Sequence, residues 1–441
     1  MIEPAGRDSC MQSQKNLSAY ASHTRTTQTP LAAQTRSAPT LCAAPAAQSA
    51  PAADPSPYKI LLYSHDTFGL GNIRRTLLLT QDLVSQYPKA AILIVTGSPM
   101  IHAFRIPDGV DYIKLPCLDR VDAERYEPRF LLDCSEEMKR TRRAILEKSI
   151  LGFAPDLMIV DKRPAGVDGE LLDTLEALQQ SPRRPRLVLG LRDILDEPER
   201  THASLVRNGC FELIERFYDE VWVYGTQSIF DPIREYRFPD AAARKTVFCG
   251  YLKRPTAAAT RESGPPRVLV TTGGGGDGGR MIEAYLEGLA MLPRNVAIET
   301  TVIFGPQMPE SKRAALLEQY DYMADVTFVD FEPDLTRRYA EADVVVSMAG
   351  YNTVCELLSF ARRAILVPRA EPVMEQLIRA RLLAEQGLFD LIEPQELTPE
   401  FLIGKVLAAF KPAAVKATPL DLDGLPRIRR RVRHLLKGEQ P

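Results

Sequence analysis

A seven-residue stretch in the second half of the chain, Gly273 to Gly279, has the composition of a phosphate-binding loop. Every residue in it except Asp277 is glycine, and it lies between an apolar run and a helical pattern. Glycine lets backbone N–H groups approach an anion closely, and the first turn of a following helix adds about half a positive charge. The stretch has no Gly-Lys-Ser/Thr of a P-loop. It is also not the clean G-x-G-x-x-G with an acidic residue about twenty positions on that a nicotinamide dinucleotide site would need. The stretch therefore predicts a site that binds a diphosphate; the alternative is a surface turn. The residues expected to contact the diphosphate are Gly273, Gly274, Gly275 and Gly276.

A second glycine-containing loop, residues 64–72, could supply acid–base chemistry. It carries His65 and Asp66 near its start and Asn72 at its end. An imidazole or carboxylate at the edge of a cleft can accept the proton of a hydroxyl group. Asp66 could equally cap the turn or the helix that follows. The loop thus predicts base candidates without choosing between them.

A third constellation begins at Ser347 and continues through Gly350, Asn352, Thr353 and Glu356. An apolar strand pattern ends at the serine, so the following turn and helix start form a second candidate anion site. Glu356 lies four residues after Asn352 and therefore on the same helix face. A carboxylate there suits hydrogen bonding to the vicinal hydroxyls of a ribose. A solvated helical glutamate is the alternative.

The elements that must position these residues alternate between short apolar strands and longer amphipathic helices. The alternation runs from Tyr58 to Tyr251, stops in a stretch rich in Pro, Gly and Ala, and restarts at Arg267. Such a pattern predicts parallel sheets covered on both faces, with ligands at the carboxyl ends of the strands. We therefore expect an α/β chain of two doubly wound, Rossmann-like domains facing a cleft. The predicted segments are 57–251 on the acceptor side, the linker 252–265, and the nucleotide-sugar-binding domain 266–441 with a final basic helix.

Composition narrows the function further. Residues 1–56 are dominated by Ala, Ser, Thr, Pro and Gln, and we expect them to form a disordered extension. The net charge of −2 lacks the basic excess of a nucleic-acid-binding protein. No apolar run approaches the ~18 residues of a membrane span. The seven cysteines contain no C-x-x-C pair, which argues against a zinc site. We expect a cytoplasmic protein without a metal. The basic run Arg429–His434 could touch anionic lipid, but we favour the interpretation that it lies on a helix packed against the first domain.

The motifs also resemble a known family. From Tyr58 to about Phe410 the chain is similar to the MurG-like GT-B glycosyltransferases of family 28, most clearly in its second half. There Val329–Glu332, Ala342–Ser347, Gly350-x-x-Thr353-x-x-Glu356 and Glu375-Gln376 occur in the family's order. The resemblance implies a GT-B fold in which Gly350, Thr353 and Glu356 hold the nucleotide, with the glutamate on the ribose.

The resemblance assigns roles to four further residues of the donor side. Phe331 corresponds to the segment lining the base pocket, and Glu375 and Gln376 to the pair that contacts the donor sugar. The family has two Gln at that pair, so the identity of the sugar stays open. Gly250-x-x-x-Arg254 is similar to the family's domain-joining motif, which aims Arg254 at the diphosphate.

The first half departs from the family at a critical place. Asn72 stands where the family usually has His, and a neutral amide cannot act as a general base. Either His65 or Asp66 takes that role, or Asp193 after a later strand does. Otherwise Asn72 only positions the acceptor, or catalysis is impaired.

Together these features predict a hexosyltransferase. Its donor would be a nucleotide-diphosphate sugar, with UDP as the expected nucleotide, and its acceptor an unidentified hydroxyl on a glycan, lipid or small molecule. No cofactor or metal is expected, and the resemblance implies inversion at the anomeric carbon. Two alternatives remain: a nucleotide-sugar epimerase or hydrolase on the same scaffold, and a catalytically degenerate sugar-nucleotide-binding protein. The basic C-terminal run adds peripheral membrane contact as an option for localisation.

Overall fold

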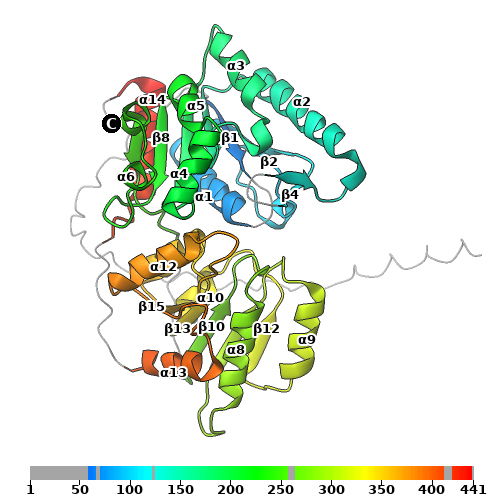
Figure 1. The fold of residues 1–441 in the computed structure, drawn as a ribbon, viewed down its shortest axis with the longest axis vertical. Helices are drawn as coiled ribbons and strands as arrows, with labels where there is room; N and C mark the ends of the chain where they lie inside the picture. The colour runs from blue at the N-terminus through cyan, green and yellow to red at the C-terminus, as the bar shows by residue number, and fades with distance from the viewer. Residues whose placement is uncertain (1–57, 66–69, 122–124, 257–263, 412–419, 440–441) are drawn as a thin grey trace, which may run out of the picture. The chain divides into compact units, whose positions relative to one another are not determined.

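Two parallel β-sheets organise the computed structural model, which describes residues 58–65, 70–121, 125–256, 264–411 and 420–439 (Figure 1). These residues all belong to one unit that spans residues 53–441. The predicted disordered extension, residues 1–56, lies outside the described residues, as does the middle of the predicted linker. The limits predicted for the two domains stay predictions.

The first sheet contains seven parallel strands in the order β3-β2-β1-β6-β7-β8-β9. Its central strands are buried along almost their whole length, as expected for continuous apolar runs in a parallel sheet. The strands are β1 (Lys59–Ser64), β2 (Ala91–Thr96), β3 (Val110–Lys114), β6 (Leu157–Asp161), β7 (Arg186–Arg192), β8 (Glu220–Tyr224) and β9 (Thr246–Phe248). The helices are α1 (Gly71–Gln86), α2 (Ser135–Phe153), α3 (Leu172–Gln180), α4 (Pro198–Arg207), α5 (Cys210–Phe217), α6 (Pro232–Glu235) and α7 (Asp240–Lys245).

The second sheet contains six parallel strands in the order β12-β11-β10-β13-β14-β15. Buried aliphatic residues from its strands and helices form a separate core, to which Val270, Val302 and Val346 contribute. The strands are β10 (Arg267–Thr271), β11 (Glu299–Ile303), β12 (Val326–Val329), β13 (Val344–Ser347), β14 (Arg363–Leu366) and β15 (Asp390–Leu391). The helices are α8 (Gly279–Ala290), α9 (Glu310–Tyr320), α10 (Thr336–Glu341), α11 (Tyr351–Phe360), α12 (Glu375–Glu385) and α13 (Pro399–Ala409).

Each sheet has a point at which the strand order reverses. In the first sheet β1 lies between β2 and β6, and in the second β10 lies between β11 and β13. The loops that leave the two central strands at such a point diverge, which opens a crevice at their carboxyl ends. The loop after β10 carries Gly273–Gly276, and the turn after β13 carries Gly350, so the topology brings two predicted anion sites to one crevice.

The last helix, α14 (Gly424–Lys437), packs on the first sheet, although in sequence it follows the second. Its apolar residues Ile428, Val432 and Leu435 recur on one helical face and are buried in the core of the first half. Arg429 pairs with Asp82 of α1, and Arg431 pairs with Glu220 of β8. Figure 1 shows α14 beside β8. The apolar face of α14 is therefore covered by protein. This agrees with the interpretation that the basic run lies on a helix packed against the first domain.

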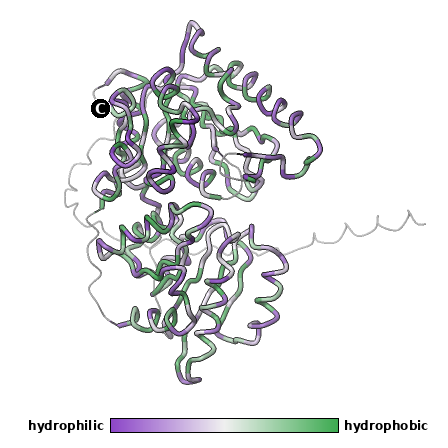
Figure 2. Tube along the Cα trace, viewed as in Figure 1, coloured by the Kyte–Doolittle hydropathy of each residue, from purple (hydrophilic) through white to green (hydrophobic). Residues whose placement is uncertain are grey.

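A small hairpin projects from the first half where the sequence had no recognisable pattern. It joins β4 (Leu118–Arg120) to β5 (Tyr126–Pro128) in antiparallel register and leads through Phe130–Leu132 into α2. Hydrophilic residues predominate along α2 (Figure 2). Among the described residues, no helix is both long enough and apolar enough to cross a bilayer.

Candidate functional site

The N-terminal ends of four helices, α1, α8, α11 and α12, meet at a cavity of about 380 Å³. Residues at or just before each helix start line it: Gly71 and Asn72, Gly276 and Asp277, Gly350 and Tyr351, Glu375 and Gln376. The first N–H groups of a helix have no intrahelical acceptor and carry a partial positive charge. The cavity, called the cleft below, is therefore an environment that favours a negatively charged ligand.

The glycine loop forms one wall of this cleft, and its backbone requires glycine. Gly273 and Gly275 have φ values of +70° and +99°, which side chains rarely adopt. A Cβ atom on Gly275 would lie 2.5 Å from the carbonyl oxygen of Phe304. Gln307 N–H donates to the carbonyl of Gly274 at 2.8 Å and fixes the loop against β11's extension. The structure thus places Gly273 to Gly276 together at the cleft, open to a ligand.

Basic side chains add to the positive field of the helix starts. Six basic residues line the cleft and two carboxylates, Asp277 and Glu375, accompany them. Sequence reasoning missed these basic residues, because they come from five separate segments and only the fold brings them together. They are Arg74, Arg75, Arg120, Lys162, Arg192 and Arg369.

Two of the charged groups at the cleft are strongly perturbed. Burial and the nearby Arg192, Arg120 and Arg163 lower the pKa of Lys162 to about 7. Burial alone would favour the neutral acid of Glu375, but Arg192, Arg379 and Arg369 lower its pKa to about 2. At neutral pH the carboxylate is therefore fully ionised, whereas the ammonium is close to its titration point.

The predicted nucleotide helix, α11, is joined to α1 of the first half through Asn352. Its amide Nδ2 donates to the carbonyl oxygen of Gly71 at 2.8 Å, and its Oδ1 accepts from Arg254 Nη2 at 2.7 Å. Arg254 Nη1 also reaches the carbonyl oxygen of Arg74 at 3.4 Å. Arg254 therefore connects the starts of α1 and α11 through hydrogen bonds, and it is not among the residues that line the cleft. Its predicted contact with a diphosphate stays a prediction.

Glu356 lies one turn deeper along α11, below Gly350 and Thr353, which both line the cleft. Its Oε1 accepts from Arg74 of α1, while its Oε2 is buried and has no hydrogen-bond partner among the described residues. One carboxylate oxygen is thus already used by the other half of the protein. Glu356 is not among the residues that line the cleft, and its predicted contact with a ribose stays a prediction.

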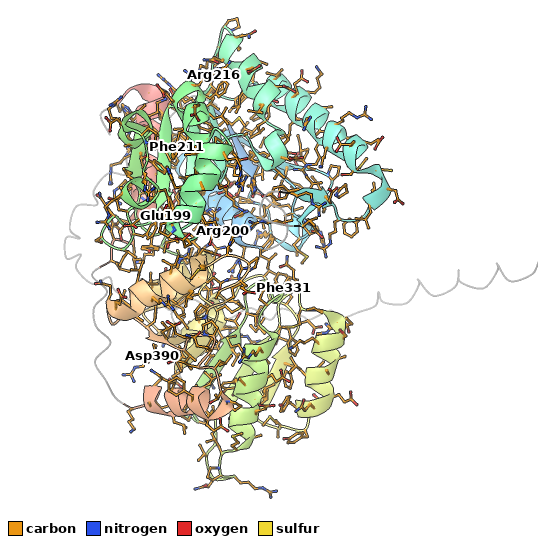
Figure 3. All side chains as sticks on the ribbon, in the orientation of Figure 1. Glu199, Arg200, Phe211, Arg216, Phe331 and Asp390 are labelled. Carbon is orange, nitrogen blue, oxygen red and sulfur yellow. The ribbon has the colours of Figure 1, made fainter. Side chains whose placement is uncertain are left out.

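Phe331 borders a smaller hollow that shares Leu70, Arg74, Gly273 and Thr353 with the cleft. Its ring meets Phe104 of the first half edge to face, with 6.4 Å between ring centroids. Figure 3 labels Phe331 in the loop between β12 and α10. An aromatic ring beside the glycine loop suits a planar base, and the role of Phe331 in a base pocket stays a prediction.

The predicted sugar pair lies in the first turn of α12, where both side chains line the cleft. Glu375 Oε2 accepts from Arg379 at 3.0 Å and Arg192 at 3.3 Å. Gln376 Oε1 is buried without a partner among the described residues. The glutamate is therefore held by arginines, and the glutamine carbonyl is the atom of the pair left for a ligand donor.

The three predicted catalytic residues that the structure describes, His65, Asn72 and Asp193, are not brought together at the cleft. Asp66 lies outside the described residues. Asn72 lines the cleft, but its Nδ2 donates to the His65 carbonyl and its Oδ1 accepts from Arg75 at 3.0 Å. The His65 ring is fully buried, and neither ring nitrogen has a partner among the described residues. Burial and the positive charges of Lys162 and Arg163 hold the pKa of His65 well below its usual range.

Asp193 lies inside a buried ion pair and not on the wall of the cleft. Arg379 grips its carboxylate through two hydrogen bonds of 2.7 and 2.8 Å, and Tyr251 OH donates to it at 3.2 Å. Arg379 also donates to the carbonyl of Ala349 at 2.9 Å. The pair connects β7 to α12 and the β13–α11 turn, so its geometry is that of a structural bridge.

A second cavity, of about 460 Å³, lies at the amino ends of β10, β11 and β12. It is larger than the cleft, but its polar groups are matched pairs such as Arg267–Glu299 and Arg337–Glu341. Parallel sheets bind ligands at their carboxyl ends, so the cleft is the candidate site. No group of three or more potential metal ligands occurs within the described part of the chain.

Comparisons with known proteins agree with this architecture. Residues 268–421 match the glycosyltransferase family 28 C-terminal domain. A relative from Phenylobacterium zucineum, named UDP-N-acetylglucosamine–N-acetylmuramyl-(pentapeptide) pyrophosphoryl-undecaprenol N-acetylglucosamine transferase, is 33% identical over 170 residues, or 36% of this chain and 46% of the relative. A protein of the same name from Thermodesulfovibrio yellowstonii is 24% identical over 342 residues, covering 76% of this chain and 86% of its own length. The chain matches 46% and 24% of the lengths of the first two relatives, from Phenylobacterium zucineum and Haemophilus influenzae.

Solved structures extend the likeness to both halves. The spinosyn forosaminyltransferase SpnP is 14% identical with a TM-score of 0.56, and the match covers 86% of this chain and all of that one. The kitacinnamycin glycosyltransferase is 16% identical with a TM-score of 0.53, covering 87% and 96% of the two chains. At these identities the likeness concerns the fold alone, and it confirms the expected GT-B class. Residues 268–421 thus match glycosyltransferase family 28, and the chain has the GT-B fold.

Proposed function

We propose that this protein transfers a hexosyl group from a nucleotide-diphosphate sugar to a hydroxyl acceptor. The observation that carries the proposal is the glycine loop Gly273–Gly276, placed where the starts of α8 and α11 meet basic residues of the first half. Preorganised N–H groups and cations stabilise a departing nucleoside diphosphate, because negative charge develops on it in the transition state. Neither a metal nor a cofactor is part of the proposal, and inversion at the anomeric carbon remains an implication of the family.

The donor would lie across the second half. We assign the diphosphate to the glycine loop and the start of α11, the base to Phe331, and the ribose to Glu356. UDP is the proposed nucleotide, since the relatives' names contain UDP-N-acetylglucosamine. Gln376 and Glu375 would contact the sugar, while Arg74 and Arg369 would face the phosphates from the rim of the cleft.

The base that activates the acceptor is proposed to be Asp66. His65 is buried and Asp193 is held by Arg379. Asp66 lies outside the described residues, and in sequence it stands between His65 and Leu70, the latter of which lines the cleft. A carboxylate can accept the hydroxyl proton as the sugar carbon is attacked. Asp66→Asn should therefore reduce turnover at least a hundredfold while UDP affinity stays within twofold.

One observation favours the degenerate alternative. Both polar atoms of the Asn72 side chain are used internally, so the position that usually holds histidine only braces the loop. If Asp66 is not a base either, the protein would bind a sugar nucleotide without transferring the sugar.

A single experiment separates these functions. Purified full-length protein is incubated with a panel of UDP-, GDP- and dTDP-sugars, and release of nucleotide is followed with and without acceptor extracts of lipids and glycans. Release that requires an acceptor supports transfer, whereas release without one supports hydrolysis. Saturable binding without release supports the degenerate protein. Acceptor work should include vesicles with anionic lipid, because we propose a cytoplasmic enzyme with peripheral membrane contact.

A further inference from the structure

Another pocket, distinct from the cavity of about 460 Å³ described above, adjoins the cleft on its acceptor side. It measures about 120 Å³ and is formed by the end of β6, the end of β7 and helix α4. Arg120, Lys162, Arg192 and Val373 line both it and the cleft, so the two spaces are contiguous. The family match begins at residue 268 and includes only Val373 of these lining residues.

This pocket, called the basic pocket below, concentrates positive charge in a chain whose net charge is −2. Six of its thirteen lining residues are Arg or Lys, and Asp196 is the one carboxylate among them. The basic residues are Arg120, Lys162, Arg163, Arg192, Arg200 and Arg207. Arg192 pairs with Glu375 at 3.3 Å and Arg200 with Asp196 at 3.6 Å, so carboxylates of the chain balance part of this charge. An anion from outside the chain would be attracted to the remainder.

Two buried polar groups in the basic pocket have no hydrogen-bond partner among the described residues. Thr201 is 5% exposed, and its Oγ1 makes no hydrogen bond to any described residue. The Nε of Arg192 is likewise buried and unsatisfied. Within the part of the chain that the structure describes, neither Lys162 nor Arg163 pairs with a carboxylate. A buried hydroxyl and a buried guanidinium N–H left without partners are costly, and an oxyanion would satisfy both.

Helix α4 presents the charge in an ordered way. Arg200, Ser204 and Arg207 recur at i, i+4 and i+7 on the face that lines the pocket. Arg200 is anchored by donating to the carbonyl of Pro372 at 3.0 Å, and Glu197 caps the helix start by accepting from two N–H groups. Figure 3 shows Arg200 on α4, at the end near α12. The guanidinium groups are therefore held on a rigid element and not on a loop.

We infer that the basic pocket binds an oxyanion, a phosphate or carboxylate group, carried by the acceptor close to the hydroxyl that receives the sugar. The inference rests on the proposed function, because it takes the cleft as the donor site. Size agrees: about 10–15 Å³ of such space holds one water, so about 120 Å³ admits a phosphate-sized group. Leu195, Leu205 and Val373 in the same wall would contact the apolar carbon skeleton next to it.

The test uses full-length protein saturated with UDP, so that the diphosphate site is occupied first. Inorganic phosphate is then titrated at pH 7 against chloride of equal ionic strength, and its affinity is obtained from the rise in Tm. Wild-type protein should show a saturable rise with phosphate that chloride does not give. Arg163→Gln should weaken phosphate at least tenfold, since a charge-assisted contact is lost. Thr201→Val should weaken it about threefold or more while leaving Tm without phosphate unchanged or higher.

A matched control separates the pocket from general surface charge. Arg216→Gln removes an arginine from α5 that is 54% exposed, pairs with Glu176 and does not line the pocket. This variant should bind phosphate like wild type. Equal affinity in all variants, or no phosphate-specific rise in wild type that binds UDP, would overturn the subsite. Failure of UDP itself to bind would instead count against the donor assignment.

Two arms distinguish the source of the oxyanion. One compares glycerol 3-phosphate with glycerol, and the other compares micellar dihexanoyl phosphatidic acid with dihexanoylglycerol. The proposal predicts that the anionic member of one pair competes with inorganic phosphate in wild type and fails to do so in Arg163→Gln. A preference for the first pair indicates a soluble acceptor, and a preference for the second indicates a lipid. Competition by neither anionic member would contradict an acceptor-borne oxyanion.

Discussion

Arg74 on α1 and Glu356 on α11 form an ion pair between the two halves of the protein, with side chains 16% and 7% exposed. The carboxylate proposed to bind ribose is thus already held by a residue that lines the cleft from the opposite half. If the nucleotide binds as proposed, it either shares Glu356 through Oε2, which has no hydrogen-bond partner among the described residues, or displaces Arg74 toward the phosphates. In both cases the ligand and the ion pair are energetically linked.

Glu356→Gln should weaken UDP about tenfold in calorimetric titration. The substitution keeps the size of the side chain and removes the charge that strengthens hydrogen bonds to ribose hydroxyls. Glu318→Gln, an exposed position on α9, is the control and should bind UDP normally. Equal UDP affinity in Glu356→Gln and the control would remove Glu356 from the ribose site.

Gly275→Ala should abolish UDP binding and lower the free energy of unfolding of the second half. The left-handed backbone alone costs about 1–2 kcal/mol for a residue with a Cβ, and contact with the Phe304 carbonyl adds to this. Gly404→Ala, in α13 with open space around it, should instead raise stability by about 0.5–1 kcal/mol and leave binding intact. Calorimetric unfolding and UDP titration measure both variants; normal UDP affinity in Gly275→Ala would show that the loop is only a surface turn.

Asp193→Asn should destabilise the protein by about 3–5 kcal/mol, because it leaves Arg379 buried with an incomplete set of partners. Thermal unfolding of Asp193→Asn is compared with that of Asp193→Leu combined with Arg379→Met, which removes both charges and should recover part of the loss. If Asp193 were instead the catalytic base, the single variant would keep its Tm and lose only turnover.

Anion binding in the basic pocket should weaken as pH rises from 6 to 8. The pKa of Lys162 is about 7, so its ammonium is charged at pH 6 and largely neutral at pH 8. Burial and Arg192, Arg120 and Arg163 lower this pKa, while Asp161 raises it, and an oxyanion facing the group would raise it further. Sulfate is the appropriate probe, because its own charge is constant over this range.

The expected change is several-fold in the sulfate dissociation constant, measured on UDP-saturated protein. Lys162→Gln should bind sulfate as weakly at pH 6 as wild type does at pH 8, with little dependence on pH. A pH profile that is the same in wild type and Lys162→Gln would assign the dependence to another group. The same substitution should stabilise the protein below pH 10. The pKa of Lys162 is lower in the folded protein than in the unfolded chain, so protonation of this lysine favours unfolding, and glutamine removes that effect.

Much of the fold follows from local patterns. Continuous apolar runs such as Leu157–Asp161 and Val344–Ser347 predict buried parallel strands, and glycine after a strand predicts a loop at the sheet's carboxyl edge. The three-residue strands β4 and β5 were not predicted, because they are too short to show an alternation of apolar and polar residues. The burial of α14 on the first sheet was signalled by its apolar stripe at Ile428, Val432 and Leu435.

The site was predictable only in part. Motif residues after β10 and β13 reach the cleft because a strand end fixes where its loop lies. The partners of a charge, however, depend on elements far apart in sequence. Asp193 follows a strand end as a base candidate would, yet Arg379, 186 residues later, binds it. Lys162 and Arg192 gave no signal, since single basic residues after strands have no characteristic spacing.

The proposed diphosphate site is tested most directly by calorimetric titration of the wild-type protein with UDP and with uridine. If N–H groups of the glycine loop and helix starts bind the phosphates, UDP should bind saturably and uridine at least tenfold more weakly. A UDP-sugar should bind at least as tightly as UDP, through added contacts with Gln376. Equal binding of UDP and uridine, or binding of neither, would contradict a nucleotide-diphosphate site in this cleft.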